Sequence, residues 1–261
     1  METPAHESYA AAEARSANSG RPSRLTVIGH RGAAGHAPEN TVAAFDRGIA
    51  LGADGVETDV RATRDGVLVL LHDATVDRTT DGSGAVADLT WAEVAALDAG
   101  ARFAGGQHAF GVQRIPRLDT FLDHYGGRTT FRLEIKARGV EGAAVRMVRA
   151  RGVMDTAVFT SFQPEAIKAV RLTAPEAQTA YLSGAQQFDD AMIETALAVG
   201  ANEVAPRAEL VEPGMVARAQ LAGLRVWAWG VKSQDVLRHA VAGGIGGCTL
   251  DYPDWATAPR A

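Results

Sequence analysis

Short apolar stretches alternate with amphipathic stretches along most of the chain, and this alternation restricts the fold more than any other feature. The strand candidates are residues 25–29, 54–60, 130–136, 156–161, 177–182, 202–206, 224–229 and 246–250. The helix candidates are residues 40–51, 118–124, 141–151, 164–172, 188–199, 213–222 and 233–242. Strands that alternate with helices in this way predict an α/β protein with a (β/α)8 TIM barrel. A doubly wound open sheet is the main alternative.

One segment breaks the alternation shortly after the second strand candidate. Asp65-Gly66 is a turn signal, and the surrounding loop is too short for a helical crossover, so the flanking strands should be antiparallel. With residues 63–66 as the loop, Glu57 would face His72. Side chains alternate along a strand, so Glu57, Asp59 and His72 would share one face. The prediction is a hairpin that extends past the barrel rim and returns His72 to the barrel mouth.

Three regions are expected along the chain. Residues 1–24 are rich in Ala, Ser and Glu and predict a disordered N-terminal tail. Residues 25–261 form the barrel domain. Within it, residues 75–115 lack the barrel periodicity and contain a helix candidate at 90–98, so we expect a small cap inserted after the His72 hairpin.

Composition narrows the class of protein. The formal net charge of -5 gives no electrostatic case for binding nucleic acid or an anionic membrane. The tail has no apolar region typical of a secretory signal, and no run is long and apolar enough to anchor the chain in a bilayer. A single cysteine, Cys248, excludes an intrachain disulfide and fits a reducing compartment. These features predict a cytoplasmic protein without a nucleic-acid partner or a stable membrane anchor.

Clusters of titratable residues stand on or at the ends of strand candidates. The clusters are His30-Arg31-Gly32, Glu57-Thr58-Asp59, His72-Asp73 and Glu134-Ile135-Lys136. The carboxyl ends of barrel strands meet at one rim, where barrel enzymes carry their active sites, so these clusters should converge. No serine or cysteine among them is placed to act as a nucleophile, and no P-loop motif is present.

The charged residues of these clusters fit phosphodiester chemistry. Glu57, Asp59 and Glu134 offer hard oxygen ligands and predict one divalent cation, Mg²⁺ or Ca²⁺. Arg31 and Lys136 would neutralise the phosphate oxygens, to which arginine can bind through two hydrogen bonds. The less specific interpretations are a solvated strand face for the acids and ion pairs with those acids for the two cations.

Two histidines and two aromatic residues complete the predicted site. His30 and His72 titrate near neutrality, so one can act as the general base and the other as the general acid. His30 could instead be a hydrogen-bonded core histidine. Phe162 and Trp229 stand at strand ends, where they would line the substrate cleft or pack in the core. Asp73 is expected to orient a neighbouring group.

An ordered set of motifs carries a resemblance to a known family. The motifs are His30-Arg31-Gly32, Pro38-Glu39-Asn40-Thr41, residues 52–60, Asp65-Gly66, His72-Asp73, Arg78-Thr79-Thr80, Ile115-Pro116, Glu134-Ile135-Lys136, Ser161-Phe162, Trp229 and Asp251-Tyr252-Pro253. In this order they resemble the glycerophosphodiester phosphodiesterase family. The resemblance covers nearly everything but the tail.

The resemblance implies a TIM barrel, a divalent cation and hydrolysis of glycerophosphodiesters to glycerol 3-phosphate and an alcohol, a reaction of lipid and glycerol metabolism. It further suggests that the glycerol hydroxyl next to the ester attacks phosphorus first and that water then opens the cyclic product. The stretch Trp229-Gly230-Val231-Lys232 departs from the family pattern Trp-Thr-Val-Asn, and this affects the expected alcohol-binding surface. The alternatives are a lyase-type lipid phosphodiesterase on the same barrel and a catalytically silent binding module.

Overall fold

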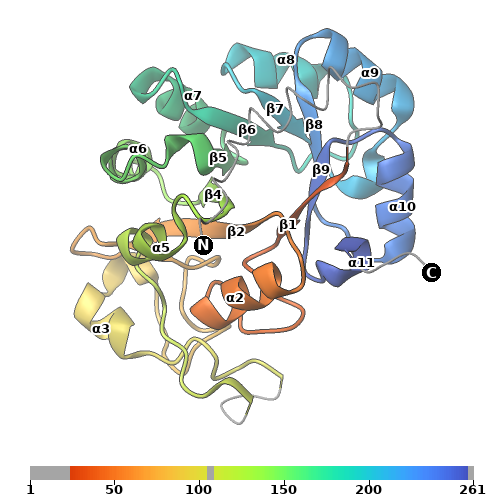
Figure 1. Cartoon of the computed structure of the whole chain (residues 1–261). Helices are drawn as coiled ribbons and strands as arrows, with labels where there is room; N and C mark the ends of the chain where they lie inside the picture. Colours follow the sequence, from red (N-terminus) through yellow and green to blue (C-terminus); the bar gives the residue numbers. More distant parts are fainter. Residues whose placement is uncertain (1–23, 105–108, 258–261) are drawn as a thin grey trace, which may run out of the picture.

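Eight parallel strands close into a barrel surrounded by helices in the computed structural model, which describes residues 24–104 and 109–257 (Figure 1). The strands of the barrel are β1 (Thr26–Gly29), β2 (Gly55–Ala62), β4 (Thr130–Ile135), β5 (Ala157–Ser161), β6 (Gln178–Leu182), β7 (Glu203–Ala205), β8 (Arg225–Ala228) and β9 (Gly247–Leu250). They follow one another around the barrel, and pairing of β1 with both β9 and β2 closes it. The TIM-barrel prediction is therefore confirmed, and the open sheet is excluded.

The described helices lie around the outside of the barrel, except the helix of the insertion, which lies beside it (Figure 1). They are α2 (Val42–Ala50), α3 (Trp91–Ala96), α5 (Leu118–Tyr125), α6 (Glu141–Ala150), α7 (Pro164–Thr173), α8 (Asp190–Ala198), α9 (Pro213–Leu221), α10 (Gln234–Ala242) and α11 (Asp254–Thr257), with 3-10 turns η1 (Val86–Asp88), η2 (Met154–Thr156) and η3 (Ala208–Leu210). Apolar stripes on these helices meet the outward side chains of the strands. Phe45 of α2 and Phe121 of α5, for example, are buried with their rings 5.0 Å apart.

The first helix begins later than its predicted start at residue 40 because of two adjacent residues. Thr41 caps α2, since its hydroxyl accepts a hydrogen bond from the amide of Ala44. Asn40 has a φ of 57°, in the left-handed region that asparagine tolerates better than most residues. The chain therefore turns at Asn40, and this turn leaves the Asn40 side chain buried inside the barrel rim rather than on the helix.

The predicted hairpin is present, but its register differs by one residue from the predicted one. The strand β3 (Leu68–Leu70) pairs antiparallel with β2, and Ala62 lies opposite Leu68 instead of Val67. The amide of Thr63 donates to the carbonyl of Val67, so Thr63 belongs to the ladder and the loop is only residues 64–66. Gly66, with a φ of 80°, supplies the left-handed residue typical of a three-residue hairpin loop.

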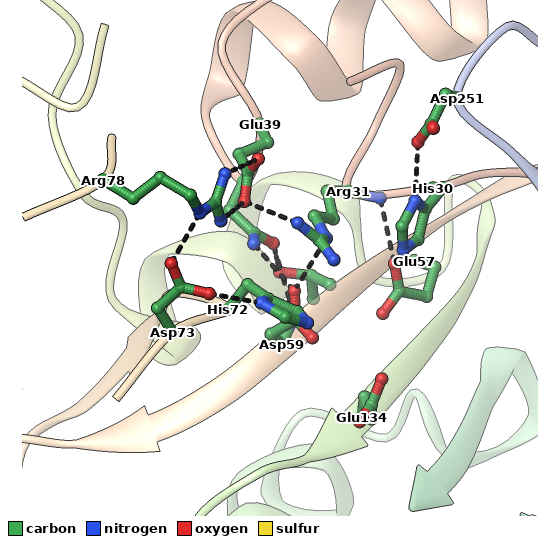
Figure 2. A network of polar contacts seen from close by, with 12 residues as sticks. His30, Arg31, Glu39, Glu57, Asp59, His72, Asp73, Arg78, Glu134 and Asp251 are labelled. Carbon is green, nitrogen blue, oxygen red and sulfur yellow. Dashed lines mark hydrogen bonds and ion pairs between the residues drawn. The ribbon is translucent and has the colours of Figure 1, made fainter. Parts of the chain in front are cut away.

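The shifted register means that His72 reaches the barrel mouth by a different route from the predicted one. Asp59 accepts a backbone hydrogen bond from Leu71, so Glu57 does not lie opposite His72. The regular strand ends at Leu70, and a bend follows that contains His72. Alternation along β3 therefore does not decide the direction of this side chain. The bend turns His72 toward Asp59 (Figure 2).

The segment after the hairpin packs as a small layer beside the barrel (Figure 1). It contains η1 and α3 and has its own apolar cluster, formed by Val69, Leu71, Val76, Val86, Val94, Ala99 and Ile115. Residues 105–108 of the predicted insertion lie outside the described residues, as does the predicted tail except Arg24. None of the described helices is long and apolar enough to cross a membrane.

Candidate active site

The predicted site residues converge at the carboxyl ends of neighbouring strands (Figure 2). His30 and Arg31 follow β1, and Glu57 and Asp59 lie on β2. Glu134 lies on β4 directly beside Asp59 in the parallel ladder. The adjacency arises because β1, β2 and β4 are neighbours around the barrel, although α2 and the whole insertion separate them along the chain.

Three buried carboxylates form a site suited to a divalent cation. Glu57, Asp59 and Glu134 each offer an oxygen, and these oxygens all lie within 4.8 Å of one another. Their exposed fractions are 5%, 0% and 6%. Within the described parts of the chain, Glu57 Oε1 and Asp59 Oδ1 have no hydrogen-bond partner. Buried, unsatisfied acidic oxygens at this spacing fit a hard cation such as Mg²⁺ or Ca²⁺.

The electrostatics of the triad also favour a bound cation. Burial and the neighbouring Asp59 raise the pKa of Glu57 to about 7 in the metal-free protein. Burial and Asp59 likewise raise the pKa of Glu134. Both shifts have the same cause, because three carboxylates crowd into a space that water does not reach freely. A dication would remove the repulsion and hold all three groups ionised.

We expect the thermal stability of the metal-free protein to fall as the pH rises from about 5 to about 8. The Glu57 carboxyl binds its proton more tightly in the folded state than in the unfolded chain, where its pKa is near 4.5. The folded state therefore loses this advantage as the pH rises through about 7. Melting curves in chelator should show the loss, and Mg²⁺ or Ca²⁺ should reverse it most strongly at the high-pH end.

The variant Glu57→Gln should weaken this pH dependence, because it removes the titrating group. Glu165→Gln provides the matched control, since Glu165 lies exposed near the start of α7. A metal-free protein whose melting temperature rises across the same pH range would contradict the prediction.

Each histidine is held by its own carboxylate through the same ring nitrogen. His30 Nδ1 lies 2.6 Å from Asp251 Oδ1, and His72 Nδ1 lies 2.6 Å from Asp73 Oδ1 (Figure 2). Such a contact at Nδ1 fixes the ring orientation and leaves Nε2 available for proton transfer. Asp73 has the orienting position expected from the sequence. Asp251 was not predicted to act in the site, although it stands in one of the family motifs.

The two histidines have pKa values shifted in opposite directions. Burial lowers the pKa of His30, but the hydrogen bond to Asp251 and the charge of Glu57 outweigh it, so the net shift is upward. Burial is the largest cause for His72 as well, and there it outweighs Asp59 and Asp73 and lowers the pKa. The site therefore contains two imidazoles with different proton affinities.

Arg31 and Lys136 flank the acidic triad and pair with it. Arg31 donates to Glu39 at 2.8 Å and lies 3.4 Å from Asp59, while Lys136 lies 2.8 Å from Glu134 and 3.6 Å from Asp59. Burial would raise the pKa of Asp59, but these two cations outweigh it and the net shift is downward. Both cations also line the central cavity, so ion pairing and substrate contact are compatible.

Two further positioning residues come from the loop before α2. Asn40 donates to Asp59 Oδ2 at 2.9 Å and accepts a hydrogen bond from Thr58, which fixes the carboxylate plane. Glu39 binds both Arg31 and Arg78, and Arg78 also binds Asp73. The sequence placed Glu39 and Asn40 only in one of the family motifs. Their place beside Asp59 depends on the turn at Asn40, which no short pattern reveals.

The converging residues line a cavity of about 280 Å³. One wall is polar and contains His30, Arg31 and Glu57. Another part of the wall contains Phe162 and Trp229, whose rings meet edge to face at 4.9 Å. These two aromatic residues are half-buried and line the cavity as well as packing against the core.

Fold and site together define a TIM-barrel enzyme with a prospective metal centre at the carboxyl end of the barrel. The profile of the glycerophosphoryl diester phosphodiesterase family matches residues 30–255. The chain therefore belongs to this family of phosphoric diester hydrolases.

Individual relatives agree with this assignment. A glycerophosphodiester phosphodiesterase of Caldanaerobacter subterraneus is 32% identical over 240 residues, which cover 88% of this chain and 96% of the relative. The crystal structure of an Agrobacterium tumefaciens glycerophosphodiester phosphodiesterase has a TM-score of 0.79 at 31% identity, covering 90% of this chain and 99% of that one. An Oleispira antarctica phosphodiesterase in complex with the product sn-glycerol-3-phosphate has a TM-score of 0.80 at 27% identity, with coverages of 90% and 96%.

Proposed function

We propose that the chain hydrolyses glycerophosphodiesters to glycerol 3-phosphate and an alcohol, with one divalent cation and two histidines as proton-transfer groups. The observation that carries the proposal is a buried carboxylate triad beside two histidines, each fixed by a carboxylate at Nδ1. The product complex of the Oleispira antarctica relative supports glycerol 3-phosphate as the product. All seven predicted catalytic and ligand side chains are present, which argues against a silent binding module.

Glu57, Asp59 and Glu134 would hold the cation in this mechanism, with Asn40 fixing the Asp59 carboxylate. When bound, the cation supplies positive charge to a phosphate oxygen and lowers the pKa of the glycerol hydroxyl next to the ester. Lys136 lies beside Glu134 at the cavity wall, where its ammonium would neutralise another phosphate oxygen.

His30 and His72 would divide the proton transfers. One takes the proton of the attacking hydroxyl as its oxygen bonds to phosphorus, and the other gives a proton to the alcohol oxygen as that bond breaks. Water then opens the cyclic glycerol phosphate by the reverse use of the same two groups. Arg31 contributes a fixed guanidinium that Glu39 holds in place. No covalent intermediate with the enzyme is formed.

The insertion has a supporting role in this proposal. Arg78 extends from it to Glu39 and Asp73, which in turn hold Arg31 and His72. We therefore propose that the described parts of the insertion, residues 75–104 and 109–115, act as a cap on the rim of the barrel domain rather than as a separate domain.

Purified protein with Mg²⁺ or Ca²⁺ should turn over glycerophosphocholine but not its 2-deoxy analogue, which lacks the attacking hydroxyl. Chelator should abolish the turnover, and added metal should restore it. Phosphorus NMR should reveal a transient cyclic glycerol phosphate. Equal turnover of both substrates without a cyclic species would favour direct attack by water, and accumulation of the cyclic species as the final product would favour a lyase.

A further inference from the structure

The floor of the cavity carries polar atoms that nothing in the site explains. Arg132, Thr160 and Trp227 come from β4, β5 and β8 and line the same cavity as His30 and Glu57. Their exposed fractions are 2%, 1% and 3%. Among the described residues, Arg132 Nη1, Thr160 Oγ1 and Trp227 Nε1 have no hydrogen-bond partner. Buried polar atoms are nearly always satisfied, so three on one cavity indicate a polar ligand.

The floor is rigidly built around these atoms. Arg132 donates from Nη2 to Glu203, and Arg225 also pairs with Glu203 at 2.9 Å. The Arg132 guanidinium lies 4.0 Å from the centre of the Trp227 ring. A methyl group on Gly247 would come within 2.2 Å of that ring, so glycine there makes the space for Trp227.

The hydrogen-bonding groups of the floor match a ligand hydroxyl. Arg132 pairs through Nη2 with the Glu203 carboxylate, which it shares with Arg225, so Nη1 remains to donate a hydrogen bond to a ligand oxygen. A hydroxyl accepts hydrogen bonds from N–H donors such as Arg132 and Trp227 and donates one to an oxygen such as Thr160 Oγ1. The floor therefore offers a ligand hydroxyl two N–H donors and one oxygen acceptor.

The position of the floor identifies which part of the substrate reaches it. Thr160 is the ladder neighbour of Glu134, and Arg132 lies two residues before Glu134 on the same strand. The floor is therefore next to the carboxylate triad and deeper in the barrel than the aromatic wall of Phe162 and Trp229. Substrate atoms beyond the triad would belong to the glycerol, while the leaving alcohol points outward.

We propose that Arg132, Thr160 and Trp227 form a subsite for the terminal hydroxyl of the glycerol moiety, so that the enzyme distinguishes glycerol from propanediol phosphodiesters. This proposal rests on the proposed function for the identity of the ligand. The three residues would act as specificity determinants, because none of them reaches the bonds that form or break in that mechanism.

Two ligand pairs test the subsite. Glycerol 3-phosphate and its 1-deoxy analogue serve for calorimetry with Mg²⁺, and glycerophosphocholine and its 1-deoxy analogue serve for kinetics. Wild type should prefer the ligand with the terminal hydroxyl by roughly 10–100-fold, because its loss leaves buried polar atoms unpaired. Thr160→Val should lower affinity and kcat/KM about tenfold for the two ligands with the terminal hydroxyl and leave the values for their 1-deoxy analogues unchanged. The preference for the terminal hydroxyl should therefore become smaller.

Three further variants control the interpretation. Thr160→Ser keeps the hydroxyl and should retain the preference for the terminal hydroxyl of the ligand. Trp227→Phe removes the indole N–H and should reduce this preference, as Thr160→Val does. Thr195→Val on α8 should change neither the preference nor the affinity, because the Thr195 hydroxyl donates to the carbonyl of Ala191 on its own helix, away from the cavity.

The outcomes separate this subsite from the proposed function. Equal wild-type binding of glycerol 3-phosphate and its analogue would overturn the subsite, as would a Thr160→Val preference unchanged from wild type. The latter result would assign the floor atoms to buried water. A binding preference that Thr160→Val abolishes, in a protein without diesterase activity, would support the subsite and reject the proposed function.

Discussion

Replacing Glu134 with glutamine should lower kcat/KM for glycerophosphocholine by about a thousandfold or more. The substitution keeps the shape of the side chain but removes one anionic ligand from the triad with Glu57 and Asp59. It also leaves Lys136 without its partner at 2.8 Å. A Lewis-acid cation contributes several kcal/mol to stabilising a developing negative charge, and a factor of ten in rate corresponds to about 1.4 kcal/mol.

Metal binding should be measured alongside the kinetics. Calorimetry with Mg²⁺ and Ca²⁺ should detect one site in wild type and a strongly weakened site in Glu134→Gln. The control Glu165→Gln makes the same chemical change on an exposed helix position and should match wild type in both measurements. Wild-type metal affinity and wild-type kcat in Glu134→Gln would remove this residue from the proposed metal centre.

The variants His30→Ala and His72→Ala should each lose about 10²–10⁴-fold in kcat, the usual contribution of a positioned general acid or base. His30 is anchored by Asp251 and His72 by Asp73, so neither ring can substitute for the other from its place in the cavity. The exposed His239 of α10 provides the matched control, and His239→Ala should retain wild-type kcat.

A substrate with a p-nitrophenyl leaving group would assign the two proton-transfer roles. This leaving group departs without being protonated, so the variant lacking the general acid should recover most of its first-step rate. The variant lacking the general base should remain slow with both substrates. Recovery of both variants, or of neither, would contradict a division of roles between His30 and His72.

Local patterns were sufficient for most of the secondary structure. Every strand candidate of the barrel overlaps an observed strand, because strands buried on both faces are rich in apolar residues. Helix ends also agreed closely where capping chemistry is local, as at the Ser233 cap of α10. The helix at 40–51 was predicted two residues too early because the left-handed turn at Asn40 depends on its buried contacts with Thr58 and Asp59.

The proximity of the candidate site residues could be predicted because a barrel brings the carboxyl ends of its strands to one rim. Glu57, Asp59 and Glu134 needed only the strand periodicity and the fold to be placed together. The hairpin register was wrong by one residue, because Thr63 pairs with Val67 and Gly66 allows a shorter loop. A turn signal in the sequence marks the existence of a hairpin but not its loop length.

The sequence by itself determined the class of fold, the family and the residues that meet at the barrel mouth, since these follow from periodicity and from ordered motifs. Only the tertiary structure decided that Asp251 holds His30 and what lies on the cavity floor. Asp251 is 221 residues from His30, and Glu203 is 71 residues from Arg132. Closure of the barrel brings these partners together from distant parts of the chain. Neighbouring sequence therefore cannot predict such contacts.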